Sequence, residues 1–183
     1  MFQLFSQILD WVCGFFTMAL LARFLMQWTR APFRNPVGEF VIALTDWAVR
    51  PTRRLIPSAY GMDLASLLLA WLTQVIFQSM FYVLGGWPGL AISGAVALLA
   101  LIEVLRVGVY LLMGVVIVSA LLSWVNPYAP LAPVLNIIAR PFLRPLQNLI
   151  PLIGGVDLSP MVLLLILQIL LSALASVQPF AFR

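Results

Sequence analysis

The chain has 183 residues, of which 63% are hydrophobic and 9% are charged. An ordinary soluble domain carries roughly 25% charged residues, so this chain has too little polar surface to face water on all sides. All ten basic residues are arginine, histidine is absent and there is one cysteine. These counts exclude an internal disulfide, a site built on several cysteines and histidine chemistry. They predict an all-α membrane protein without a cofactor, a metal site or catalytic residues, and the net charge of +4 gives no argument for a nucleic-acid contact.

Four segments are apolar and long enough to cross a bilayer core, which takes about 20 helical residues. In chain order they cover about residues 4–28, 63–84, 96–125 and 158–177. The first is expected to be a retained helix rather than a cleavable signal, because no basic residue precedes it. The third belongs to an apolar run over residues 90–125, which is far longer than one span needs. It is either one spanning helix with a lead-in or two short helices, and the internal repeat favours one helix.

That repeat is an ungapped match between two stretches 94 positions apart, the distance from residue 50 to residue 144. The first stretch contains Arg50-Pro51, Leu55-Ile56-Pro57 and Gly61-Met62-Asp63-Leu64, and the second contains Arg144-Pro145, Leu149-Ile150-Pro151 and Gly155-Val156-Asp157-Leu158. The period is too long for a solenoid, so the match indicates a duplicated membrane unit. We predict two tandem, parallel helix–loop–helix repeats, residues 1–89 and 90–183.

The arginines concentrate in the two loops that join paired spans. Residues 29–62 hold five arginines and two acidic residues, and residues 126–156 hold two arginines and no acidic residue. Cytoplasmic loops are rich in basic residues, so we predict both loops in the cytoplasm, both termini outside, and insertion in the bacterial inner membrane. Each loop is expected to contain an interfacial helix. The first helix, near residues 37–48, has one apolar face. The second, near residues 133–143, is less clearly amphipathic. The alternative for this second helix is that it packs against the helix bundle and does not lie at the membrane surface.

The second unit carries a recognisable signature. It reads Ser123-Trp124-Val125-Asn126-Pro127, then Arg140-Pro141-Phe142-Leu143-Arg144-Pro145, then Leu149-Ile150-Pro151-Leu152-Ile153-Gly154-Gly155-Val156-Asp157-Leu158-Ser159-Pro160. This closely resembles the YggT family of small bacterial membrane proteins, and the resemblance covers both units. The first unit departs from the pattern, because residues 60–66 lack the double glycine and the Ser-Pro.

The resemblance implies a membrane protein and names no reaction. It implies roles in envelope organisation, cell division or osmotic-stress tolerance and, in photosynthetic relatives, in nucleoid distribution and cytochrome assembly. The chain has no histidine and no Cys-x-x-Cys-His, so it is not expected to hold haem itself.

The basic residues of the loops are candidate contacts for anionic headgroups or an acidic partner. An equally weighted alternative is that they serve topology alone. They are Arg50, Arg53, Arg54, Arg140 and Arg144. Arg50 and Arg144 are favoured, because the repeat places them equivalently.

Two aspartates stand directly before the second span of each unit. We interpret Asp63 and Asp157 as helix caps that satisfy backbone N–H groups, with Pro160 in a first helical turn. A pair of aspartates sharing a proton is the remote alternative, because such a site would lie deeper in the bilayer. The signature and cap candidates are Asp63, Pro151, Gly154, Gly155, Asp157 and Pro160.

Polar residues also occur inside the predicted spans. Glu103 and Arg106 are one turn apart and are expected to pair. Glutamine and serine recur at a spacing of four in the second span of each unit, which indicates hydrogen bonds between helices or, alternatively, a solvated pathway. The intramembrane candidates are Gln74, Gln78, Glu103, Arg106, Gln168 and Ser172.

Together these features favour a non-enzymatic membrane scaffold or assembly factor. Its expected partners are the lipid bilayer, anionic headgroups and other membrane proteins, and a homo-oligomer is possible. The alternative is a small channel or transport-related protein, which would have to oligomerise because four helices enclose little lumen.

Overall fold

The computed structural model describes residues 2–56, 61–91, 94–126, 128–150 and 157–176. These residues form helices joined by short connections, and no strand occurs among them. The helices are α1 (Phe2–Trp28), α2 (Pro36–Leu55), α3 (Leu64–Leu84), α4 (Pro88–Ala91), α5 (Gly94–Val125), α6 (Ala132–Gln147) and α7 (Ser159–Ser176). Four of them, α1, α3, α5 and α7, are long and apolar enough to cross a membrane. The predicted all-α class with four spans is confirmed.

The apolar run over residues 90–125 contains one long helix. The short α4 ends at Ala91, and residues 94–125 form α5, a single helix of 32 residues. At about 1.5 Å per residue α5 is about 48 Å long, against a hydrocarbon core of about 30 Å. Such a helix tilts or projects beyond the bilayer. The single-helix interpretation of this run is right and the two-helix alternative is wrong.

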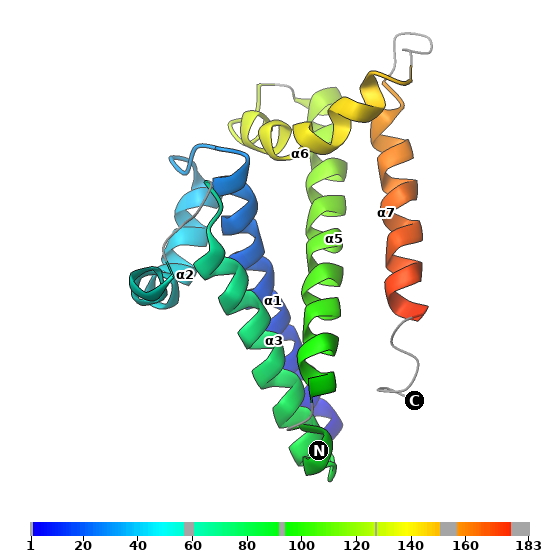
Figure 1. Ribbon diagram of the computed structural model, residues 1–183. Helices are drawn as coiled ribbons and strands as arrows, with labels where there is room; N and C mark the ends of the chain where they lie inside the picture. The colour runs from blue at the N-terminus through cyan, green and yellow to red at the C-terminus, as the bar shows by residue number, and fades with distance from the viewer. Residues whose placement is uncertain (1, 57–60, 92–93, 127, 151–156, 177–183) are drawn as a thin grey trace.

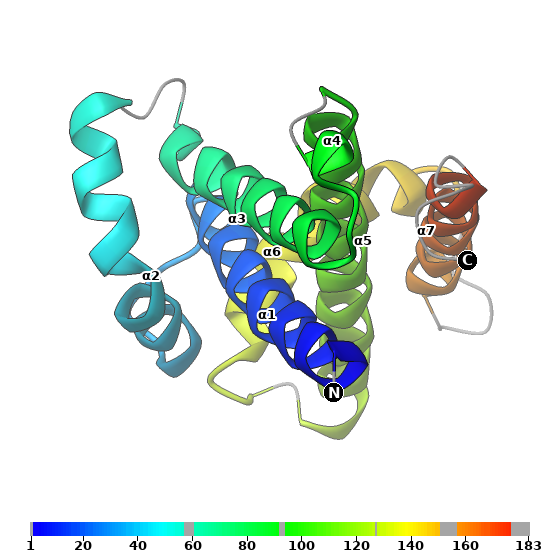
Figure 2. The same ribbon diagram turned by 90° about the horizontal axis from the view of Figure 1, so that it is seen from below.

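The spanning helices alternate in direction (Figure 1). Helices α1 and α5 run towards the end of the molecule that holds α6, and α3 and α7 return from it. Helix α1 therefore begins, and α7 ends, at the same end of the bundle. Helices α1, α3 and α5 pack together, whereas α7 lies to one side and packs mainly on α5 and α6 (Figure 2). One apolar cluster joins α1, α2, α3 and α5, and a second joins α5, α6 and α7.

The two loop helices have different neighbours. Helix α2 begins at the N-cap Asn35, whose side-chain oxygen accepts a hydrogen bond from the Gly38 N–H at 2.9 Å, and it packs on α1 and α3. Its predicted apolar face is divided, because Val41 is buried while Phe40 and Trp47 are exposed. Helix α6 packs on α5 and α7, as in the alternative arrangement. Its polar and apolar faces are separated as clearly as those of α2, so its predicted weak amphipathicity is wrong.

Candidate functional site

Asp63 is the N-cap of α3 and has no exposed surface. One carboxylate oxygen accepts a hydrogen bond from the Ser66 N–H at 3.5 Å, and the other accepts one from the Ser66 hydroxyl at 2.6 Å. Arg53, near the end of α2, donates to both oxygens of the same carboxylate and also donates to the Gln27 side chain of α1 at 2.7 Å. A forked guanidinium–carboxylate pair is strong and directional. Asp63 therefore both caps α3 and fixes α2 against it.

A second arginine reaches the same place from α1. Arg23 is 5% exposed. Its guanidinium lies 2.9 Å from a carboxylate oxygen of Asp46 and 3.6 Å from one of Asp63, and it donates to the Thr45 hydroxyl at 2.8 Å. Arg50 then pairs with the other oxygen of Asp46 at 2.7 Å. The side chains of Arg23, Asp46, Arg50, Arg53 and Asp63 form one connected set, which we call the buried ion network.

The charges of this network determine the ionisation of Asp63. Burial raises the pKa of the Asp63 carboxyl, but hydrogen bonds from Arg53 and Ser66 and the charge of Arg53 outweigh burial and hold that pKa below its usual range. Asp63 is therefore ionised at neutral pH. Our sequence predictions assigned no role to Arg23, although an arginine in an apolar helix requires a partner, and that signal was available.

Two of the loop arginines proposed as headgroup contacts, Arg50 and Arg53, belong to the buried ion network. Arg53 pairs with Asp63 within the chain while its side chain stays 36% exposed, so its contact with headgroups stays a prediction. The side chain of Arg50 is 78% exposed while it pairs with Asp46. Arg54, Arg140 and Arg144 are also exposed, and their contact with headgroups stays a prediction.

Asp157 stands before α7 in a different setting. One of its oxygens accepts a hydrogen bond from the Ser159 N–H at 2.8 Å, and the other accepts one from the Gln147 side chain of α6 at 2.8 Å. Burial raises the pKa of Asp157, but the hydrogen bonds from Ser159 and Gln147 outweigh it and lower that pKa. Pro160 lies in the first turn of α7, whereas Pro151, Gly154 and Gly155 lie outside the described residues.

Asp157 also lines a cavity of about 680 Å³ between α5, α6 and α7. The polar side chains of Ser119, Asn136 and Gln147 line it as well, and the Ser119 hydroxyl donates to the Asn136 side chain. The remaining wall is largely apolar, with Trp124 among its members. This carboxylate thus faces a cavity, whereas that of Asp63 is enclosed by arginines.

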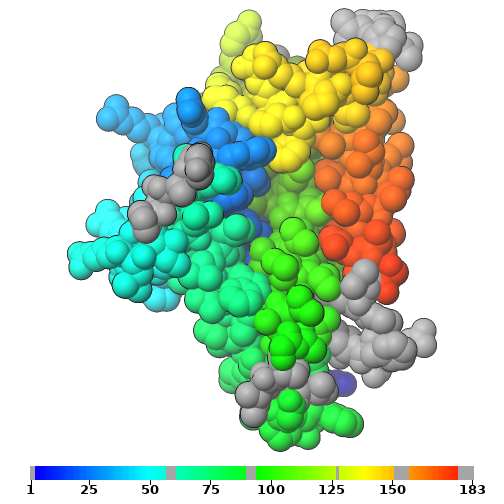
Figure 3. Space-filling view, in the orientation of Figure 1, coloured from blue at the N-terminus to red at the C-terminus, as the bar shows by residue number. Residues whose placement is uncertain are grey.

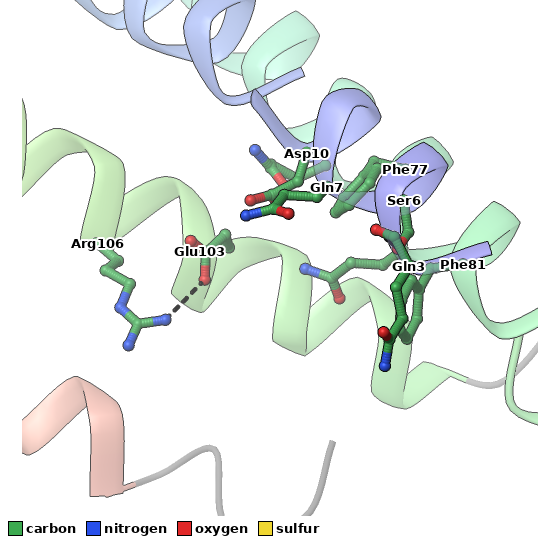
Figure 4. A pocket seen from close by; sticks show the side chains of 10 residues that line it. Gln3, Ser6, Gln7, Asp10, Phe77, Phe81, Glu103 and Arg106 are labelled. Carbon is green, nitrogen blue, oxygen red and sulfur yellow. Dashed lines mark hydrogen bonds and ion pairs between the residues drawn. The ribbon is translucent and has the colours of Figure 1, made fainter. Parts of the chain in front are cut away.

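Intramembrane polar residues converge at the opposite end of α1, α3 and α5 (Figure 4). They surround a cavity of about 390 Å³, which we call the polar cavity. Its lining comprises Gln3, Ser6, Gln7, Asp10, Gln74, Phe77, Gln78, Phe81, Glu103 and Arg106. Glu103 and Arg106 pair at 3.4 Å, as the sequence predicted. The predictions missed the α1 residues, although their spacing of three and four places them on one helix face.

The predicted stripe of glutamine and serine is divided between two environments. Gln74 is 2% exposed, and its amide donates to the Thr17 hydroxyl of α1 at 3.1 Å. Gln78 is also buried. Gln168 and Ser172, the expected equivalents on α7, are exposed and lie outside the polar cavity.

The comparison with known proteins assigns the chain to a family. The model of the family described as CCB3/YggT matches residues 2–84 and 98–178, which is most of the chain. The chain belongs to the CCB3/YggT family. It is 37% identical over 172 residues to "Uncharacterized protein YggT" of Escherichia coli K12, covering 93% of this chain and 88% of that protein. It is also 37% identical over 171 residues to an uncharacterized protein of Pseudomonas aeruginosa, covering 89% and 84%. No solved structure matches.

Both aspartates of this YggT-family chain fall within matched segments. Gln147 follows Arg53 by 94 positions, as Asp157 follows Asp63. In the first segment the charged Arg53 donates to Asp63, whereas at the equivalent position of the second segment the uncharged amide of Gln147 donates to Asp157. The two carboxylates keep a capping position before a span and differ in the charge of their neighbours.

Proposed function

We propose that this chain is a non-enzymatic scaffold or assembly factor of the bacterial inner membrane. The family resemblance points to envelope organisation, cell division or osmotic-stress tolerance as its setting. In this proposal the two segments that match the family model are tandem, parallel repeats. The arginine-rich loops face the cytoplasm and both termini face outside, as the charge bias requires. The partners are other membrane proteins, with anionic headgroups near the exposed arginines.

The observation that carries the proposal is the fixed position of α2. A helix lying at a membrane surface needs only an apolar face, whereas α2 is tied to α1 by Arg23–Asp46 and to α3 by Arg53–Asp63. Buried ion pairs contribute little net stability, because desolvation offsets their attraction, but they require one geometry. The buried ion network therefore orients α2, as a docking element requires.

The outer side of α2 presents an aromatic patch together with α1. Phe40 is 55% exposed and lies with its ring centre 6.3 Å from that of Phe15. Trp47 is 72% exposed and stacks on Phe16 at 5.7 Å. Large aromatic side chains are enriched where proteins meet, because they bury much area at little cost in conformational freedom. We assign this patch, Phe15, Phe16, Phe40 and Trp47, to a protein partner.

Photo-crosslinking in native membranes tests the proposal. A photoreactive amino acid at Phe40 is expected to capture one reproducible membrane protein, identified by mass spectrometry. Trp87, an exposed aromatic residue between α3 and α4, is the control position and is expected to capture none. Capture of lipid alone at Phe40, or the same captured proteins at both positions, would refute the scaffold role of α2.

A channel or transport-related function is the second candidate, and the polar cavity favours it. Its glutamines and charged residues come from three spanning helices, and such residues within a membrane mark ion paths. Ion flux into liposomes separates the candidates. Selective flux that Gln74→Leu abolishes and Thr73→Val preserves would replace the scaffold proposal, because of these two neighbours on α3 only Gln74 lines the polar cavity.

A further inference from the structure

Helix α7 is less covered than α3 and α5. Four of its 18 residues are buried, against seven of the 21 residues of α3 and nine of the 32 residues of α5. A row of buried leucines, Leu163, Leu167 and Leu171, joins the apolar cluster on α5 and α6, and Leu164 and Leu174 pack beside it. In the space-filling view α7 forms one margin of the molecule and α2 the opposite margin (Figure 3). The faces of α7 that point away from α5 and α6 are therefore open to lipid or to another protein.

A polar side chain lies in the middle of this exposed surface. Gln168 is the tenth of the 18 residues of α7, so it stands near the centre of the hydrocarbon region. Its side chain is exposed, and its amide makes no hydrogen bond to any part of the chain that the structure describes. The apolar cluster between α5 and α7 includes Leu112 and Val116 of α5. An amide in hydrocarbon without a hydrogen-bond partner is unfavourable, so its partner comes from another molecule.

The neighbours of Gln168 form a seam suited to a second helix. On the flank of α7 that carries Gln168, exposed residues recur at steps of three, four and three, which is the spacing of a coiled-coil contact. They are Leu165, Gln168, Ser172 and Ala175. Ser172 and Ala175 are small and permit close approach of two helices. A single polar residue within such a seam fixes the register of the two helices.

The chemistry of the amide identifies the occupant. A glutamine side chain both donates and accepts hydrogen bonds, so two copies related by a twofold axis satisfy each other. We propose that α7 is the interface for a second copy of this chain, with the two Gln168 amides hydrogen-bonded across the axis. Since α2 and α7 lie on opposite sides of the molecule (Figure 2), this dimer leaves both aromatic patches free. The interface does not depend on the proposed scaffold function.

Disulfide crosslinking in native membranes tests the geometry. The native Cys13 is replaced by alanine, and single cysteines are introduced as Ser172→Cys on the seam and Ile166→Cys on the other flank of α7, where Ile166 is 47% exposed. Oxidation is expected to give a covalent dimer of this chain with Ser172→Cys and little with Ile166→Cys. Equal yields, or a product with a different protein, would overturn the proposal.

Substitution of Gln168 tests the chemistry. Gln168→Leu removes the amide and is expected to raise the dissociation constant of the dimer about 3- to 30-fold, the range for interhelical hydrogen bonds in membranes. Gln168→Asn keeps an amide and is expected to stay closer to the wild type. Energy transfer between labelled copies, diluted with lipid in vesicles, measures both constants. A Gln168→Leu protein that dimerises as the wild type does would overturn the proposal.

Discussion

Removing the charge of Asp63 is expected to destabilise the protein far more than removing the charge of Asp157. Asparagine caps a helix about as well as aspartate, so Asp63→Asn removes the charge and retains the cap of α3. Asp157→Asn is the matched control, because it makes the same chemical change before α7, where the neighbour is the amide of Gln147 rather than an arginine.

The burial of the partners sets the magnitude. The side chains of Asp63 and Arg23 are 0% and 6% exposed, and that of Arg53 is 36% exposed. Breaking a buried ion pair from one side costs about 3–5 kcal/mol, because the other charge is left without a partner. Water reaches Arg53 and recovers part of this cost, so we expect about 3 kcal/mol for Asp63→Asn. Asp157→Asn is expected to cost less than about 1 kcal/mol, because only hydrogen bonds from neutral donors change.

A double variant isolates the stranded charge. Arg53→Gln places at residue 53 the amide that occurs at Gln147, so Asp63→Asn combined with Arg53→Gln leaves only Arg23 of the two arginines around residue 63. The free energy of unfolding of each variant can be measured by titration with a denaturing detergent in mixed micelles, followed by fluorescence of the six tryptophans. We expect the double variant to be more stable than Asp63→Asn alone. Equal losses for Asp63→Asn and Asp157→Asn, or simple additivity in the double variant, would refute the reasoning.

Three further predictions concern the pH dependence of stability, the role of Asp157 and the topology. The pKa of Asp63 is lowered on folding. The contribution of Asp63 to stability is therefore present above the unfolded-state pKa of about 3.9 and is lost as the pH falls through the lower folded pKa. Acid unfolding is expected below about pH 4, and the stability of Asp63→Asn is expected to depend less on pH. At α7, Asp157→Ala is expected to cost on the order of 1 kcal/mol and Asp157→Asn less, whereas an asparagine variant without function at a normal protein level would indicate proton chemistry instead. With Cys13 removed, cysteines at Thr52 and Gln147 are expected to react with an impermeant thiol reagent only after the cell membrane is permeabilised. Labelling of intact cells at either position would contradict the predicted topology.

Features that depend on local properties of the chain were predictable from the residues alone. Hydropathy and segment length predicted four spans, because a bilayer requires about 20 apolar residues whatever they pack against. The position of Asp63 directly before an apolar segment predicted a helix cap, because capping involves only the next turn of the same helix. The pairing of Glu103 with Arg106 was predictable for the same reason, since both residues lie on one helix.

Which helices supply partners to one another depends on how the helices pack in three dimensions. Arg53 of α2 pairs with Asp63, and Arg23 of α1 pairs with Asp46, so no spacing along the chain encodes either pair. Only Arg50–Asp46, of the pairs in the buried ion network, has the i, i+4 spacing of one helix. Gln74 and Gln168 occupy equivalent places in the sequence repeat, yet one is buried against Thr17 and the other is exposed. The reason is that α3 packs closely between α1 and α5, whereas α7 contacts α5 and α6 through one apolar cluster at the margin of the bundle, so that the side chain of Gln168 stays exposed.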